Sequence, residues 1–340
     1  MNALRFLLLP SFVGFLALAC NDNEVDLTSN FKDIPVVYGL LDASEDSNWV
    51  RINKAFLGDG NALVFAQIAD SLNYPNLQVA LLKLNMSNNQ VVDSLPMQKT
   101  INAIPKDSGV FASNSNVLYL TTSPIDKNFR YTLVIFNPDN QKRTEATTNI
   151  ANSSVFNYPN SPSVALNWEP NTNNNNKLVR FEWSCNTSAT TQAHQFELTF
   201  IYDEFPQSNP SNRVRKSFTN RYSMIPNSDC QSNLIKLPIT KEEFYSSVVN
   251  NLAKDQTLGR EFIQIDIAVY GAAKAFYDYL VINKPSASVV PRATDYTNIP
   301  EGKGVFSSRS QLHMRGLKLN SITIDSLRGG QYTSELNFSN

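Results

Sequence analysis

Cys20 is the residue whose place in the sequence points most directly to a chemical modification. It ends an apolar stretch, residues 6–19, that follows the positively charged Arg5. These 14 residues are too few to span a bilayer, which requires roughly 20 apolar residues, but they fit the apolar part of a signal peptide. The small side chains of Ala17 and Ala19 suit a peptidase cleavage site just before the cysteine.

The tetrapeptide ALAC, residues 17–20, resembles the bacterial lipobox, in which the cysteine thiol receives diacylglycerol before cleavage. It departs from the strictest form, because Ala17 occupies the −3 position and leucines lie at −4 and −2. The alternative is a plain secreted protein with a chance cysteine, but the chain has only three cysteines. We therefore predict a signal peptide over 1–19, a lipid on Cys20 that anchors the chain to a membrane, and a flexible tether over 20–33. The acyl chains of this lipid, such as palmitate, can be labelled to test the anchor.

Polar and acidic residues follow the cysteine in the run NDNEVD, residues 21–26. Asn21 stands where enterobacterial lipoproteins kept in the inner membrane carry aspartate, and an acidic run here resembles the surface-export signal of Bacteroidetes lipoproteins. These features predict a lipid-anchored outer-membrane protein. The sequence does not decide whether it lies on the periplasmic or on the surface-exposed face of that membrane.

Cys185 and Cys230 remain once Cys20 carries a lipid. An oxidising compartment permits a disulfide between them, and closing a loop of about 45 residues would contribute about 3–4 kcal/mol in the chain-entropy model. The alternative is two separate buried thiols, since free cysteine is a frequent core residue. The sequence leaves this choice open.

Catalytic and metal-binding patterns were sought among the remaining residues. The chain has two histidines, His194 and His313, and His194 alternates with apolar residues in a predicted strand, so we expect a structural or surface role for it. The motifs H-E-x-x-H and G-x-S-x-G do not occur. We predict no catalytic residue, no metal ion and no cofactor; a glycan hydrolase that uses two carboxylates is the weaker alternative.

Three further patterns have simpler structural explanations. Residues 42–53 place polar side chains as a calcium loop does, but Ser47 replaces the required glycine and Asn53 the final glutamate, so a hairpin turn is favoured. The glycine pairs at 58–60 and 302–304 do not join a strand to a helix, which makes phosphate binding a weak hypothesis. The tryptophans are expected mainly in the core.

Three Asp-Ser-Leu triplets match the short O-glycosylation sequon of Bacteroidetes. Their serines are Ser71, Ser94 and Ser326. Short motifs have high false-positive rates, so glycosylation is a hypothesis that intact-mass analysis can test.

Composition excludes some functions and permits a large core. The net charge of −1 argues against nucleic-acid binding, which requires a basic surface. Hydrophobic residues make up 42% of the chain, enough for substantial cores, while charged residues make up only 17%.

Period-two and apolar patterns predict a mainly β fold in which two β-sandwich-like domains, 34–153 and 164–340, are joined by a proline-containing linker at 154–163. Strand patterns occur at 36–41, 49–56, 77–84, 109–120, 129–136, 143–150, 164–168, 178–185, 194–202, 213–218, 262–270 and 317–324. The strand at 77–84 is expected to be covered on both faces, and the asparagine-rich run 171–176 to be a hairpin loop. The second domain is expected to contain short helices near 240–254, which starts with a Thr-x-x-Glu capping box, and near 272–281. Residues 284–292 are expected to form a loop.

Together, several of these segments resemble the Bacteroidetes lipoproteins of the domain of unknown function 4249 type. The resemblance lies in the leader, residues 35–56, 129–150 and 276–310, with Asn298, Ile299, Gly302, Gly304 and Phe306 in the last of these. It implies a lipid anchor, an N-terminal immunoglobulin- or transthyretin-like domain and a second β-rich domain. It also implies accessory work beside a TonB-dependent outer-membrane β-barrel transporter or envelope complex.

The leading hypothesis is therefore a non-catalytic accessory or ligand-binding lipoprotein whose small-molecule or glycan ligand the sequence does not identify. The alternative is a fimbrillin-like structural or adhesive surface subunit, which would assemble through donated strands.

Overall fold

The computed structural model describes residues 33–55, 61–169, 178–185, 190–283 and 295–339. Contacts group Ile34–Asn340 into one compact unit. Cys20, the predicted signal peptide, the loops predicted at 171–176 and 284–292, and the glycine pair at 58–60 lie outside the described residues. Within the described ranges, no helix is both long and apolar enough to cross a membrane.

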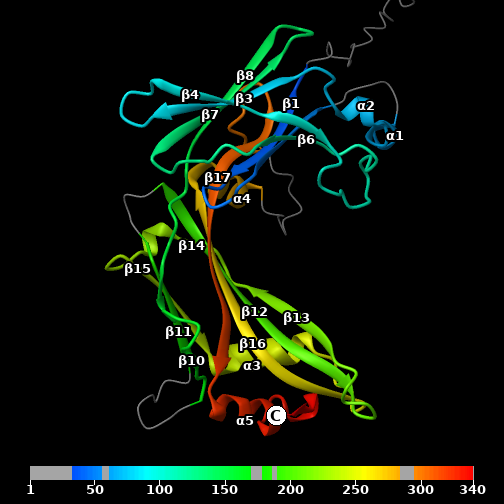
Figure 1. The fold of residues 1–340 in the computed structure, drawn as a ribbon, viewed down its shortest axis with the longest axis vertical. Helices are drawn as coiled ribbons and strands as arrows, with labels where there is room; N and C mark the ends of the chain where they lie inside the picture. Colours follow the sequence, from blue (N-terminus) through cyan, green and yellow to red (C-terminus); the bar gives the residue numbers. More distant parts are fainter. Residues whose placement is uncertain (1–32, 56–60, 170–177, 186–189, 284–294, 340) are drawn as a thin grey trace, which may run out of the picture. The chain divides into compact units, whose positions relative to one another are not determined.

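Two β-sheets build the N-terminal part, drawn in blue to green in Figure 1. One contains β1 (Pro35–Leu41), β2 (Asn48–Lys54), β6 (Val117–Thr121) and β5 (Gln98–Ile101). The other contains β4 (Val91–Pro96), β3 (Gln78–Asn85), β7 (Phe129–Asn137) and β8 (Lys142–Asn149). The short helices α1 (Ala62–Ala66) and α2 (Ala69–Leu72) follow β2 in the chain.

Alternating side chains from both sheets form the first hydrophobic core. Val37 and Val50 come from one sheet, and Leu81 and Leu133 come from the other. Because every second residue of a strand faces the same side, these alternating patterns bury one face of each sheet against the other.

The C-terminal part also places two sheets around a core. The larger contains β13 (Val214–Arg221), β12 (Thr191–Pro206), β16 (Leu258–Ala273) and β17 (Lys303–Leu319), and the smaller contains β15 (Leu234–Thr240), β11 (Leu178–Ser184) and β9 (Phe156–Tyr158). Short strands β10 (Ala165–Leu166), β14 (Ile225–Pro226) and β18 (Phe338–Ser339) join the larger sheet. The mainly β class, with sheets packed face to face, is confirmed.

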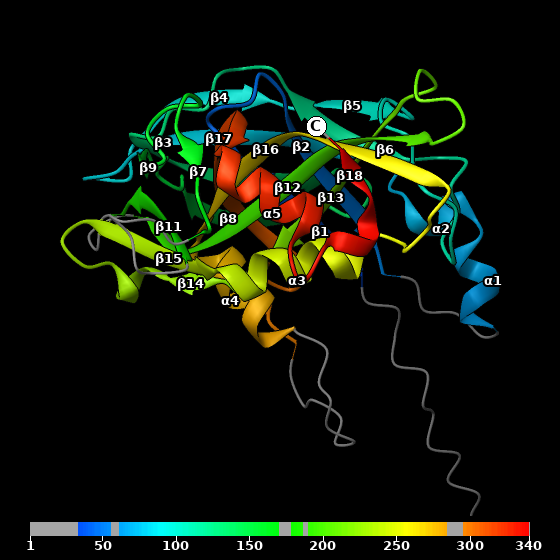
Figure 2. The same ribbon diagram turned by 90° about the horizontal axis from the view of Figure 1, so that it is seen from below.

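Three helices and two 3₁₀ turns complete this part. The helices are α3 (Lys241–Asn251), α4 (Lys274–Ile282) and α5 (Ser321–Gly329), and the turns are η1 (Asn227–Asp229) and η2 (Ser334–Leu336). The capping box expected at the start of α3 is present, with the Thr240 hydroxyl accepting from the Glu243 amide. Figure 2 shows α3 and α5 near each other, where the Tyr245 hydroxyl reaches the Thr323 carbonyl oxygen at 3.4 Å.

Strand β17 belongs to both parts, because its first half, residues 303–308, pairs with β1 and its second half, residues 309–317, pairs with β16. Its first half sends Phe306 into the N-terminal core. At Gly304 the backbone has φ +92°, and a Cβ atom there would lie 2.0 Å from the Val37 carbonyl oxygen, so this position requires glycine. The sequence patterns assigned no strand to residues 303–310, because the first half of β17 is buried on both faces and shows no alternation.

Other expectations also need correction. Strand β3 buries Val79 and Leu81, but its opposite face is only partly covered, because only one face of the sheet points to the core. Residues 109–116 form a loop instead of a strand, held by hydrogen bonds between Asn102 and Asn116. The strand predicted at 317–324 ends at Leu319, since Asn320 caps α5.

The predicted linker contains a strand of its own. Within 154–163, β9 pairs with β11 and buries Phe156 in the second core. The first core includes residues up to Ile150 and then regains Ile299 and Phe306 from the end of the chain. The chain therefore passes from the first core to the second near residue 150. Strand β17 joins β16 of the C-terminal part and β1 of the N-terminal part in one continuous sheet.

Candidate functional site

A cavity of about 400 Å³ in the N-terminal part contains three cationic side chains, and we call it the cationic pocket. It is bordered by β1, β2, the end of α2 and the loop that precedes β6. Its lining residues are Val36, Tyr38, Arg51, Asn53, Lys54, Ala55, Leu72, Asn73, Lys106, Phe111, Ser115, Asn116 and Val117.

Strand β2 directs Arg51 and Asn53 into this pocket. Val50 and Ile52 are buried in the first core, so the residues between them face the opposite side of the sheet. Lys54 follows at the end of the strand, where it pairs with Pro35 of β1. The period-two pattern that forms the core therefore also places Arg51 and Asn53 on the pocket side of β2, while Lys54 lines the pocket from the end of the strand.

The loop before β6 supplies the third cation, Lys106. Its ammonium donates to the Ala112 carbonyl oxygen at 2.8 Å and lies 5.7 Å from the centre of the Phe111 ring. Asn116 joins the loop to β2, because its side-chain oxygen accepts from Arg51 Nη2 at 3.0 Å and its amide donates to the Ile104 carbonyl at 2.8 Å. Arg51 and Lys106 are thus oriented by neutral partners.

The charges in the cationic pocket are not balanced. Among the described residues, the lining contains no Asp or Glu, and none of Arg51, Lys54 and Lys106 forms an ion pair. Burial lowers the pKa of Lys106, and the nearby Arg51 charge lowers it further. The pKa shift has the direction expected for cations that repel each other in a partly desolvated space.

Much of the remaining wall of the pocket is apolar, beside the polar side chains of Asn53, Asn73, Ser115 and Asn116. Val36, Leu72 and Val117 contribute aliphatic surface, and the aromatic rings of Tyr38 and Phe111 are 43% and 52% exposed. Such a combination of apolar walls and a few convergent polar groups is typical of small-molecule sites.

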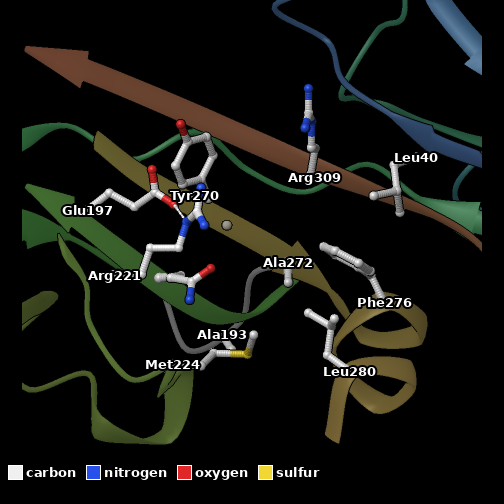
Figure 3. A pocket seen from close by; sticks show the side chains of 12 residues that line it. Leu40, Ala193, Glu197, Arg221, Met224, Tyr270, Ala272, Phe276, Leu280 and Arg309 are labelled. Carbon is white, nitrogen blue, oxygen red and sulfur yellow. Dashed lines mark hydrogen bonds and ion pairs between the residues drawn. The ribbon is translucent and has the colours of Figure 1, made fainter. Parts of the chain in front are cut away.

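A second cavity, of about 360 Å³, lies on the C-terminal sheet and holds its charges in pairs (Figure 3). Glu197 of β12 accepts from Arg221 Nε of β13 at 2.6 Å, next to Tyr270. Phe276 and Leu280 of α4 form the apolar side in the same view. We call this the paired pocket.

Arg309 of β17 also borders the paired pocket, and it too has an acidic partner. Its Nε lies 3.4 Å from a carboxylate oxygen of Asp42, a buried residue in the turn between β1 and β2. The other Asp42 oxygen accepts from Ser44, and Asn48 accepts from the Asp42 amide. The segment that resembles a calcium loop is therefore a hairpin turn closed by its own side chains.

A third cavity, of about 390 Å³, lies beside the disulfide and includes His194. This histidine is 2% exposed, and burial lowers its pKa to about 4, although the nearby Asn227 side chain opposes this shift. It sits 6.2 Å from Trp183, ring centre to ring centre. His194 is therefore a neutral histidine of the interior, as expected from its strand position.

Cys185 and Cys230 form a disulfide, with their Cα atoms 5.9 Å apart. Cys185 follows β11 directly, and Cys230 follows η1. Trp168 and Trp183 are fully buried in the second core, and this prediction is confirmed. Gly302 and Gly304 lie where β17 meets β1, which gives the pair a structural reason.

The three sequon serines differ in their surroundings. Ser94 is exposed on β4. Ser71 is partly buried in α2, and its hydroxyl donates to the carbonyl oxygens of Phe65 and Ile68. Ser326 is partly buried in α5, where it hydrogen-bonds Glu169. Among these positions, only Ser94 presents its side chain openly.

The cationic pocket was not predicted from the sequence. Arg51 and Lys106 are far apart in the chain, and the fold brings them together through the loop that Asn116 holds. The one available signal was the alternation of β2, which placed Arg51 and Asn53 on the face away from the core. Across the described ranges, no group of three His, Cys, Asp or Glu side chains is arranged to hold a metal ion.

Comparison with known proteins gives no assignment. No protein-family model matches the chain, and no curated protein matches it. The likeness to the domain of unknown function 4249 lipoproteins stays a prediction.

Proposed function

We propose that this protein is a non-catalytic, lipid-anchored module of the outer membrane that binds a ligand for a TonB-dependent transporter or envelope complex. The observation that carries the ligand-binding part is the cationic pocket, where three cations without acidic partners among the described residues face one cavity with apolar walls. The lipid anchor is carried by the signal-peptide pattern that ends at Cys20.

Binding fits the polar groups of this pocket better than catalysis. The lining offers guanidinium, ammonium, amide and hydroxyl donors, and among its described residues there is neither a carboxylate nor a histidine beside them. General acid–base catalysis commonly uses such a group within hydrogen-bonding reach of the reacting atom. Donors without that partner hold and orient an anionic group.

A pull-down from native membranes in mild detergent tests the accessory role. We expect the tagged protein to recover a β-barrel transporter, whereas polymers of this chain on native gels would favour the fimbrillin-like alternative. Recovery of no transporter would contradict the accessory role. Palmitate labelling tests the anchor separately, because a Cys20→Ala protein that still takes up label would contradict it.

A further inference from the structure

We propose that the cationic pocket binds a small organic anion, in which a carboxylate or phosphate group is carried on an apolar or aromatic body. This inference rests on the ligand-binding part of the proposed function and names the ligand's chemical class. Arg51 is the principal contact of the oxyanion, and Lys54 and Lys106 supply further positive charge.

The hydrogen-bonding capacity of the cations supports an oxyanion. A guanidinium has five N–H donors in a planar fork, and Arg51 has one hydrogen bond to a described residue, from Nη2 to Asn116. Lys106 has three donors and uses one for the Ala112 carbonyl. Lys54 makes no side-chain hydrogen bond or ion pair within the described part of the chain. Donors therefore remain for carboxylate or phosphate oxygens, which guanidinium groups bind in a bidentate geometry.

The charge distribution makes an anion a better occupant than a neutral molecule. The chain as a whole has a net charge of −1, yet every charged residue among the described ones that line this cavity is positive. Burial and the Arg51 charge already lower the pKa of Lys106. A bound anion would relieve the repulsion between the cations and would be attracted strongly in a space partly shielded from water.

The apolar wall indicates what else the ligand carries. Tyr38 and Phe111 are half exposed at the pocket, and Val36 lies beside Tyr38 on β1. Aromatic and aliphatic walls of this kind bury an apolar or flat body. An inorganic ion alone would leave that surface unused.

Calorimetric titration of the purified full chain tests the proposal with four probes: phenyl phosphate, benzoate, inorganic phosphate and benzamide. We expect phenyl phosphate or benzoate to bind, with the tighter of the two identifying the oxyanion. Benzamide, which keeps the ring but lacks the charge, should bind at least tenfold more weakly than that anion, and so should inorganic phosphate, which lacks the ring. Failure of both aromatic anions to bind, or equal affinity for benzamide, would overturn the proposal. Equal affinity for inorganic phosphate would overturn the apolar part.

Two variants and two matched controls assign the binding to this pocket. Arg51→Gln should weaken binding by about tenfold to a hundredfold, the range for losing a charged hydrogen-bond partner. Lys54→Gln removes a charge without removing a described contact, and should weaken binding by about fivefold even if Arg51→Gln folds poorly. The controls Arg180→Gln on β11 and Lys236→Gln on β15, both exposed, should bind as the wild type does. Equal affinities in variants and controls would contradict the assignment.

The outcomes also separate this inference from the proposed function. Calorimetry uses the purified chain, and the pull-down uses native membranes. A recovered transporter together with no anion binding would refute only the ligand class. Anion binding together with no recovered transporter would refute only the accessory role.

Discussion

Two charged sites of the molecule, the surroundings of Arg260 and the cationic pocket, differ in how their charges are partnered. In the C-terminal part, Arg260 is 1% exposed, and it donates to Glu204 at 3.0 Å and to the carbonyl oxygens of Leu336 and Ala253 at 2.8 and 2.9 Å. In the N-terminal part, the cations of the cationic pocket have no acidic partner among the described residues. In the first arrangement the charged groups are bonded to other groups of the protein. In the second, the cations keep hydrogen-bond donors that no described residue uses.

A second buried charge in the C-terminal part, Glu169, is also bonded to other groups of the protein. Glu169 is buried and accepts from Lys241 at 2.5 Å and from the Tyr245 hydroxyl at 3.0 Å. Burial alone would raise the pKa of Glu169, but hydrogen bonds from Lys241, Ser326 and Tyr245 hold it below its usual value. Removing one partner of a buried charge pair is strongly destabilising. Cations that repel one another at a cavity reduce stability, and under our proposal a bound anion compensates their charge.

The largest expected effect on stability is at Arg260, where the charge is buried and paired. Arg260→Met removes one of the two cationic partners of Glu204, the other being Lys216, and leaves the buried carbonyl oxygens that Arg260 bonds without their donor. It should lower the free energy of unfolding by about 3–5 kcal/mol in urea denaturation. Replacing the exposed Arg180 by Met is the matched control and should change it little. The double variant Arg260→Met with Glu204→Leu should recover much of the loss. An Arg260→Met protein as stable as the control would contradict the account.

The disulfide should make the next largest contribution. It closes a separation of 45 residues, which corresponds to about 4 kcal/mol in the chain-entropy model. We expect the double variant Cys185→Ala with Cys230→Ala, or the reduced wild type, to lose stability of this order in urea. The variant should retain its affinity for anions, because the disulfide lies outside the cationic pocket. Equal stability with and without the bond would show that the pairing adds nothing.

The interior histidine predicts a pH dependence of stability. Folded His194 takes up a proton only near pH 4, because burial lowers its pKa to about 4, whereas an unfolded histidine does so near pH 6.5. Between these values the unfolded chain binds more protons, so stability falls as the pH decreases from 6.5 to 4, by about 3 kcal/mol in total.

His194→Phe should remove this part of the dependence in urea denaturation at several pH values. His313→Gln is the control, because His313 is exposed, and it should keep the wild-type slope. Glu169 and Glu204 act separately at lower pH, where protonation of carboxyls with depressed pKa values removes their stabilisation. A wild-type slope in His194→Phe would show that this histidine is not the cause.

The smallest effect on stability is expected in the cationic pocket. Arg51→Gln loses one hydrogen bond to Asn116 but also removes repulsion with Lys106, so the free energy of unfolding should change by less than about 1 kcal/mol. The same urea denaturation measures it beside Arg260→Met. If Arg51→Gln lost as much free energy of unfolding as Arg260→Met, the difference between the cationic pocket and the surroundings of Arg260 would be contradicted.

Local patterns predicted the elements whose burial is regular. The alternation of β11 and the capping box of α3 are properties of neighbouring residues, and both appear as expected. Strand β17 was missed because its first half is buried on both faces and therefore shows no alternation. This strand contains buried serines and a glycine that packs closely against β1. These residues fit contacts with distant segments, and the local sequence does not reveal those contacts.

The candidate site depends on contacts between distant segments. Alternation placed Arg51 on the outer face of β2, but Lys106 reaches the same cavity only through a loop fixed by Asn116. Whether Cys185 and Cys230 pair likewise depended on a spatial separation, 5.9 Å between Cα atoms, that the sequence does not contain. Charge balance around a cavity is visible only after folding.

One measurement tests the central claim on both parts at once: the free energy of unfolding with and without phenyl phosphate, for the wild type, Arg51→Gln and Arg260→Met. At a concentration ten times the wild-type dissociation constant, the ligand should stabilise the wild type by about 1.4 kcal/mol. We expect Arg260→Met to gain the same amount from its lower baseline, and Arg51→Gln to gain almost none. An equal gain in Arg51→Gln, or no gain in the wild type, would contradict the assignment of the cationic pocket as the anion site.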